Sequence, residues 1–505
     1  MNARENSFNI RDQIIKNSFW NVINSGINRV GSFILVILLS RILMPEGFGR
    51  YSLALTVALF FMTFSDMGIN QTLIRYASMG INKKNGKSSS YFRYLLKIKF
   101  FLTLFLSGIL LILSYPLSFY IFQDSELFIP LLILSFYVFL TSLTGFFESL
   151  FFIKKNVRYI SFKESALLVL KLIAISLIGY LIIIQARLVW IFLSFVILSM
   201  LTFFFDFYFS KRAYPNLFQK TKEEIDKKEI RKFILSLNVQ NIALTILAQA
   251  GILFLGIFLP AKYVGYYNSS LIIVASLANL FLFSSVFLPI LTNMKEDKFR
   301  NFIKKIFRLF FLILLPLSFG LSILSRFFIF AIYGEDYLPA WISLSVLAFL
   351  IPCIVGVDLS LVSFSSKNKL KSFSRLMLLS TLIFIFLNYI FLKIFLNFSP
   401  EAVLVGASIA ALITWLFCFI FSVFLLKKEL NLQVISSWIF KPILSCIIMS
   451  GFLLLFLRFG EMTILKGIFS IVLGALIYLI CLFLVKGIKK EEIASILKII
   501  LSRKN

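Results

Sequence analysis

The chain has 505 residues, of which 60% are hydrophobic, and its mean hydropathy is +0.95. Soluble domains are about 45–50% apolar, so this composition excludes a soluble enzyme or binding module and indicates an integral membrane protein. The chain has no histidine, and its four cysteines are scattered in apolar segments without metal-ligand spacing. We therefore expect no catalytic residue, no metal site and no cofactor.

Fourteen segments are long and apolar enough to cross a bilayer, which takes about 20 residues. We predict an all-α membrane protein with two pseudo-symmetric six-helix lobes (helices 1–6 and 7–12) and two additional helices, 13 and 14. The predicted spans are 17–40, 52–75, 95–121, 127–152, 161–184, 188–210, 233–259, 264–293, 306–333, 338–364, 373–397, 401–426, 438–457 and 463–485. The predicted domains are the N-lobe (1–210), a linker (211–232), the C-lobe (233–426), and helices 13 and 14 with a tail (427–505).

The formal net charge of +28 arises mostly from one side of the predicted topology. All but ten of the 51 lysines and arginines lie in the termini, in alternate loops of one side, or at the helix ends beside them. Cytoplasmic loops carry such an excess, so we place both termini and the linker 211–232 in the cytoplasm. The charge is thus a topology signal and predicts no nucleic-acid partner. We expect the charged linker to be a solvated amphipathic segment on the membrane surface.

Two segments, 17–52 and 234–268, repeat one pattern. Each is an apolar helix with polar residues three or four positions apart, followed by a turn rich in Gly and Tyr. The polar residues are Asn17, Asn21, Asn24, Asn28 and Ser32 in the first copy and Asn238, Asn241, Thr245 and Gln249 in the second. The turns 48–52 and 264–268 match at an offset of 216 residues. Such a repeat in a membrane chain is most simply a transporter with two lobes around a hydrated cavity.

The segment around the first turn resembles a known family. Residues 39–51 are LSRILMPEGFGRY, and SDMGI at 65–69 and Arg75 follow. This segment resembles the lipid-linked oligosaccharide flippases, polysaccharide-biosynthesis transporters that include the Wzx O-antigen flippases. The family's usual form is Ser-Arg-x-Leu, then Pro, an acidic residue and Gly/Tyr, and later Asp-x-Gly.

The resemblance implies a fold of the MOP superfamily, with two six-helix bundles in a V and transport by alternating access. It implies that undecaprenyl-diphosphate-linked oligosaccharide repeat units move across the bacterial inner membrane, for the assembly of O-antigen of lipopolysaccharide, capsule or exopolysaccharide. The expected partners are this lipid-linked oligosaccharide, membrane lipid, and the glycan polymerase and chain-length machinery.

Three other functions fit the sequence less well. Multidrug and toxic-compound extrusion (MATE) proteins often have an acidic residue in helix 1, whereas residues 17–40 hold no carboxylate. Lipid II flippases have an Arg-Asp pair in the first helix that is missing here. A membrane glycosyltransferase or polymerase needs a sizeable external loop with catalytic acids or bases, and the predicted external loops are only a few residues long.

Two basic residues lie deep within predicted spans, Arg29 in the first and Lys171 in the fifth. An ionised group at the bilayer centre costs about 2.5–3.5 kcal/mol, so it is rarely without a role. We expect both side chains to face the cavity and to bind the diphosphate, Arg29 as a planar fork and Lys171 as a point charge. The alternative for Lys171 is an ion pair with Glu148 or Glu164 that joins helices 4 and 5.

The polar residues of the repeat are the other candidates for substrate binding. The amides of Asn21, Asn24, Asn28, Asn241 and Gln249 donate and accept hydrogen bonds, which suits sugar hydroxyls. The alternative is hydrogen bonding between helices of the two lobes, worth about 0.6 kcal/mol for each bond. The sequence leaves both open.

Intramembrane carboxylates are candidates for ion coupling. Asp66 and Asp358 lie within predicted spans, where a desolvated carboxylate can bind a proton or Na⁺. The alternative is an ion pair between helices or a charge lining a hydrated vestibule. For Glu148, Glu164 and Asp206, near the cytoplasmic side, we favour this alternative.

Overall fold

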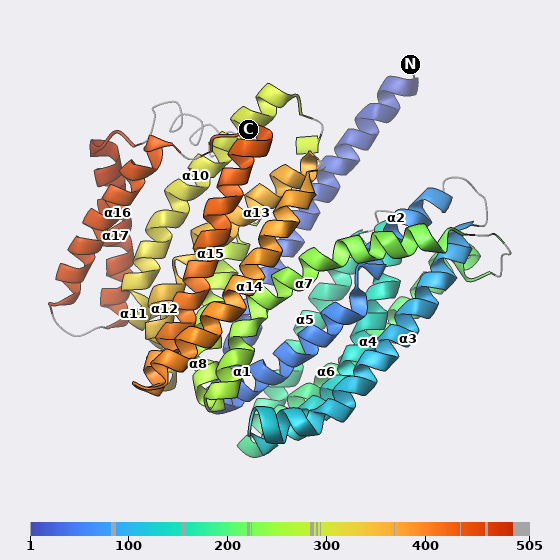
Figure 1. The fold of residues 1–505 in the computed structure, drawn as a ribbon, viewed down its shortest axis with the longest axis horizontal. Coiled ribbons are helices and arrows are strands. Elements are labelled where there is room, and N and C mark those ends of the chain that lie inside the picture. Colours follow the sequence, from blue (N-terminus) through green and yellow to red (C-terminus); the bar gives the residue numbers. More distant parts are fainter. Residues whose placement is uncertain are drawn as a thin grey trace. The chain divides into compact units, whose positions relative to one another are not determined.

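The computed structural model describes the backbone of residues 2–81, 87–153, 157–219, 223, 225–282, 287–288, 291–292, 294–367, 369–434, 436–459 and 463–487. It describes their side chains except those of residues 2–25, 27, 78–81, 157–158, 232–233, 235–240 and 437. All regular elements in this part of the chain are helices (Figure 1), which confirms the all-α prediction.

The helices divide into two compact units, residues 1–268 and 269–505. The elements of the first unit are α1 (Asn2–Asp66), α2 (Ile69–Ile81), α3 (Lys87–Pro116), η1 (Leu117–Ile121), η2 (Ser125–Leu127), α4 (Phe128–Ile153), α5 (Val157–Leu181), α6 (Ile184–Ala213), η3 (Pro215–Phe218), α7 (Lys227–Phe258) and the beginning of α8 (Ala261–Asn279). The second unit continues with α10 (Glu296–Ile323), α11 (Ser325–Tyr333), η4 (Glu335–Ala340), α12 (Trp341–Leu347), α13 (Leu350–Ser366), α14 (Leu370–Phe395), α15 (Pro400–Leu430), η5 (Ser437–Ile439), α16 (Phe440–Leu457) and α17 (Ile464–Leu484).

Helix α1 contains both of the first two predicted spans. It is continuous from Asn2 to Asp66 except at Met44, whose φ of 59° is non-helical and which precedes Pro45. Proline has no N–H for the helical ladder, so the helix bends here. A second break follows at Met67 and Gly68, both with positive φ, and separates α1 from α2.

The structure holds 11 helices, or up to 12 if a bent pair is one span, that are long and apolar enough to cross a membrane within the described residues. The predicted number is fourteen, and the difference arises at three places. The first two predicted spans form one kinked segment from Asn28 to Ala77. The tenth is the bent pair, with a 48° bend between Glu335–Leu347 and Leu350–Ser366. The eighth, 264–293, includes residues outside the described part. The count of fourteen stays a prediction.

The two repeated turns contact each other through equivalent atoms. A Cβ on Gly49 would overlap the carbonyl group of Ala261, and a Cβ on Gly265 would overlap the carbonyl oxygen of Pro45. Pro45 and Ala261, like Gly49 and Gly265, are 216 residues apart. Reciprocal contacts of this kind are typical of a two-fold relation between copies. The offset found in the sequence therefore recurs in space.

A hydrogen bond and a salt-bridge cluster hold this region. Asn268 Nδ2 donates to Ser52 Oγ at 2.7 Å, again across an offset of 216 residues. Arg50 bridges three carboxylates, with Nε 2.7 Å from Asp124, Nη1 2.5 Å from Glu126 and Nη2 2.9 Å from Glu46. The turn after Met44 is thereby joined to the loop between α3 and α4, and both were predicted to lie on the external side.

We expect Gly49→Ala to destabilise the protein by about 1–3 kcal/mol. The new methyl group would overlap a backbone carbonyl group, which cannot move aside by a change of rotamer as a side chain can. The thermal stability of purified protein in detergent checks this. Gly108→Ala on α3 is the matched control, since a Cβ there has nothing within 4 Å. Equal melting temperatures for the two variants would contradict the close approach.

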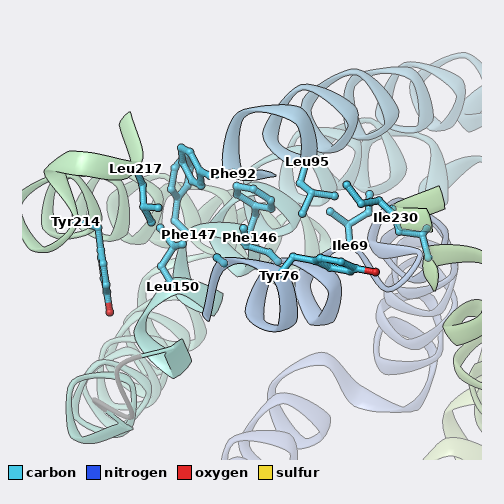
Figure 2. Close-up of a cluster of buried hydrophobic side chains, with 13 residues drawn as sticks. Ile69, Tyr76, Phe92, Leu95, Phe146, Phe147, Leu150, Tyr214, Leu217 and Ile230 are labelled. Carbon is cyan, nitrogen blue, oxygen red and sulfur yellow. The ribbon is translucent and has the colours of Figure 1, made fainter. Parts of the chain in front are cut away.

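The linker is anchored by a cluster of buried side chains at one end of α2, α3 and α4 (Figure 2). Leu217 of η3 and Ile230 of α7 are both buried members of this cluster, which also includes Phe92 and Phe146. Helix α7 begins at Lys227, six residues before the predicted seventh span, because the Asp226 side chain caps it by accepting from the N–H groups of residues 228 and 229. Apolar side chains thus attach the linker to the first unit.

Candidate functional site

A pocket of about 230 Å³ lies between α4, α5 and α6 in the first unit. Lys163, Leu167 and Lys171 line it from α5, where a spacing of four residues places them along one side of the helix. The other lining residues are Tyr137, Thr141, Thr144, Gly145, Glu148, Glu164, Phe195, Leu198, Ser199 and Thr202. The pocket therefore combines charged, hydroxyl and aromatic side chains in a segment that the sequence assigns to the membrane.

Lys171 lies in this pocket, as a functional role requires. Its Nζ is 5.3 Å from the centre of the Phe195 ring, a cation–π distance. Among the described residues it has no ion-pair partner, and the nearby carboxylates of Glu148 and Glu164 lie within 4 Å of Lys163 instead. Lys171 thus presents a cation that has no carboxylate of the described part within 4 Å.

Lys163 is at the centre of a buried salt-bridge cluster. Its Nζ is 2.8 Å from Asp206 Oδ2, 3.0 Å from Glu148 Oε2 and 3.9 Å from Glu164 Oε1. The Asp206 carboxylate is fully buried and also accepts from Tyr159 at 3.4 Å. This cluster joins α4, α5 and α6 at one side of the pocket through Glu148 and Asp206, which agrees with the interhelical role favoured for these two carboxylates, whereas Glu164 lies beside Lys163 on α5 itself.

Asp66 is in a second ion pair of this kind. Lys99 Nζ on α3 is 3.2 Å from Asp66 Oδ1 and donates to the carbonyl oxygen of Ser65 at 3.1 Å. Lys99 is buried, whereas Asp66 is 29% exposed. The pair ties the end of α1, before the break at Gly68, to α3.

Lys99 and Lys163 are buried cations that were not among the predicted functional residues. Both were counted with the basic helix ends of the cytoplasmic side, because each is only a few residues inside its predicted span. The sequence does place carboxylates in neighbouring predicted spans, and these could have indicated an ion pair for each lysine. Which lysine meets which carboxylate depends on how α3 to α6 pack.

Asn28 and Arg29 are half-buried on α1. Ser165 Oγ on α5 donates to Asn28 Oδ1 at 3.1 Å, so this amide bonds between helices. Of the described residues that line the Lys171 pocket, none belongs to α1. Asn28 on α1 is therefore bonded to α5, the helix that carries Lys171. Arg29 does not line the pocket.

The polar residues of the second copy contact the second half of α1. Thr56 Oγ1 donates to Gln249 Oε1 at 3.3 Å, and the hydroxyls of Thr63 and Thr245 are 3.2 Å apart. The backbone oxygen of Asn241, half-buried on α7, accepts from Thr245. Gln249 therefore accepts a hydrogen bond between helices of the two predicted lobes, the second of the two predicted roles, whereas Thr63 and Thr245 donate to carbonyls of their own helices.

The remaining candidates lie elsewhere. The side chains of Asn21 and Asn24 lie outside the described residues. Asp358 is half-buried on α13 of the second unit. Within the described residues no group of three His, Cys, Asp or Glu side chains could hold a metal ion.

The model of the family "Polysaccharide biosynthesis protein" matches residues 38–342, more than half of the chain. The chain belongs to this family. A relative in Klebsiella pneumoniae, described as an uncharacterized membrane protein in the cps region, is 26% identical to this family member over 371 residues, 68% of each chain.

Two solved structures have a similar fold. The lipid II flippase MurJ, in an inward closed conformation, gives a TM-score of 0.72 at 17% identity, over 91% of this family member and 97% of that chain. A multidrug resistance MATE family transporter of the MOP superfamily, inward-facing, gives a TM-score of 0.59 at 12% identity, over 80% and 94%. The chain therefore shares its fold with these two transporters.

Proposed function

We propose that the protein is a flippase, which moves undecaprenyl-diphosphate-linked oligosaccharide repeat units across the bacterial inner membrane for the assembly of O-antigen, capsule or exopolysaccharide. Membership of the polysaccharide biosynthesis family is the observation that carries the proposal. The fold likeness to a lipid II flippase and the relative from a cps region support it. The role is transport and not catalysis.

Lys171 is the residue of this chain that fits the proposal best. A diphosphate needs a cation that is accessible and not already neutralised, and Lys171 lines a pocket and has no ion-pair partner among the described residues. Arg29, on the helix that packs against α5, is proposed as the second phosphate ligand. Asn28, Asn21, Asn24, Asn241 and Gln249 are proposed to contact the sugars during transport, when their bonds to neighbouring helices open.

The proposal includes alternating access by two six-helix lobes, residues 1–210 and 233–426, joined by the linker 211–232, with both termini in the cytoplasm. Asp66 and Asp358 are the proposed ion-coupling residues. Asp66 forms a salt bridge with Lys99, and a proton or Na⁺ that binds to Asp66 would take the place of the lysine. The proposed partners are the glycan polymerase and the chain-length machinery.

A drug exporter is the second candidate, because a MATE transporter has a similar fold. Lys171, which has no salt bridge among the described residues, disfavours a cationic drug in this pocket, since like charges repel in a medium of low dielectric constant.

Purified protein in liposomes distinguishes the two candidates. We expect transfer of a fluorescent lipid-diphosphate-linked glycan between leaflets and no uptake of a cationic dye. In the same assay, ionophores that collapse the proton and Na⁺ gradients should slow glycan transfer if Asp66 or Asp358 couples transport to an ion. Dye uptake without glycan transfer would favour the exporter.

A further inference from the structure

The hydrogen-bonding groups of the Lys171 pocket are unevenly distributed. Four hydroxyl groups lining it each donate their proton to a carbonyl of their own helix. These are Thr141 (2.6 Å), Thr144 (2.8 Å), Ser199 (2.8 Å) and Thr202 (2.9 Å). A hydroxyl group has one proton, so only lone pairs remain for a ligand. The carboxylates of Glu148 and Glu164 also only accept, so these residues of α4, α6 and the start of α5 present acceptors, beside the hydroxyl of Tyr137, which can also donate.

The available charged donor lies farther along α5. The ammonium of Lys163 is taken up by Glu148 and Asp206, at 3.0 and 2.8 Å. Lys171 follows Glu164 by seven residues, about 10 Å along the helix at 1.5 Å per residue, and its ammonium lies over the Phe195 ring. The pocket therefore has an acceptor-rich part near Glu164 and a cationic part at Lys171, with aromatic surface beside the latter.

We infer that this pocket binds one sugar ring together with the phosphate attached to it. The phosphate would lie at Lys171, and the sugar hydroxyls would donate to Glu164, Glu148 and the threonine oxygens. The volume of about 230 Å³ suits one monosaccharide and not a whole repeat unit. The inference rests on the proposed function and deepens it, because it makes Glu164 a specificity-determining residue for the sugar next to the diphosphate.

Glu164 is the better residue for a test than Glu148. Its side chain is 49% exposed and 3.9 Å from Lys163, whereas Glu148 is 21% exposed and forms a 3.0 Å ion pair. Removal of Glu164 therefore leaves the Lys163–Asp206–Glu148 contacts in place. Ser176→Ala is the matched control, since Ser176 is exposed on the same helix and bonds only to its own helix at Leu172.

The experiment is a ligand-observed NMR titration of the purified full-length protein with a hexose 1-phosphate, inorganic phosphate and the free hexose. We expect the hexose 1-phosphate to bind most tightly. Glu164→Ala should weaken its binding about tenfold or more, the effect of losing a hydrogen bond to a charged group, and leave inorganic phosphate unchanged. Glu164→Gln, which keeps an acceptor oxygen, should retain part of the preference. Lys171→Ala should weaken the binding of both hexose 1-phosphate and inorganic phosphate.

The inference is overturned if the wild type binds inorganic phosphate as tightly as hexose 1-phosphate, or if Glu164→Ala changes neither ligand. Glycan transfer in liposomes separates this failure from that of the proposed function. If glycan transfer is normal and Glu164→Ala binds hexose 1-phosphate as tightly as the wild type does, the sugar subsite is refuted and the proposed flippase function stands. Glu164-dependent binding of hexose 1-phosphate without any glycan transfer would refute the flippase and leave the subsite.

Discussion

Replacing Lys171 by alanine is expected to remove export of the glycan while the protein level in the membrane stays normal. The substitution deletes a cation that has no carboxylate within 4 Å in the described part of the chain, so it breaks no salt bridge there and the fold should persist. A charged hydrogen bond to phosphate is worth about 1.5–3 kcal/mol, so transport should fall tenfold to about a hundredfold. Immunoblots of surface glycan and of the tagged protein measure the two quantities.

Three further variants make this test specific. Lys171→Arg keeps the charge and should retain part of the export, and Ser176→Ala on the same helix should behave as the wild type. Arg29→Ala should also abolish export if Arg29 is the second phosphate ligand. Normal surface glycan in both Lys171→Ala and Arg29→Ala would remove these residues from the substrate site.

Lys163→Met is expected to have the largest effect on stability. It would leave the fully buried Asp206 and the partly buried Glu148 without the ammonium that both contact. Breaking a buried ion pair by removing one partner costs about 3–5 kcal/mol, because the remaining charge is left desolvated. We therefore expect a strong loss of folded protein on heating, measured by size-exclusion chromatography of the purified protein in detergent.

A triple variant tests whether the unpaired carboxylates cause the loss of stability. The triple variant Lys163→Met, Glu148→Gln, Asp206→Asn removes the uncompensated carboxylates and should recover much of the stability. Lys211→Met, an exposed lysine on the helix that carries Asp206, should stay within about 0.5 kcal/mol of the wild type. If the triple variant is no more stable than Lys163→Met, lost packing and not unpaired charge is the cause.

Much of the fold could be predicted because bilayer physics is local in sequence. Apolar segments of about 20 residues satisfy their backbone hydrogen bonds internally only as helices, so composition alone predicts an all-α protein. The offset of 216 residues between the two turns likewise needed only the chain, and Gly49 and Gly265 meet across it. The span count did not follow as directly, because hydropathy does not show that the helix continues through the bend at Met44.

The sequence by itself determined the fold class, the internal repeat and the presence of a deep lysine at 171, since each depends on residue type and spacing. Only the tertiary structure decided the partners of the charges: Asp66 with Lys99, and Glu148 and Asp206 with Lys163. A salt bridge depends on two side chains meeting within 4 Å, and the sequence separations here are 15 to 43 residues. How helices rotate against one another sets that distance, and this rotation is a property of packing that a single helix pattern does not contain.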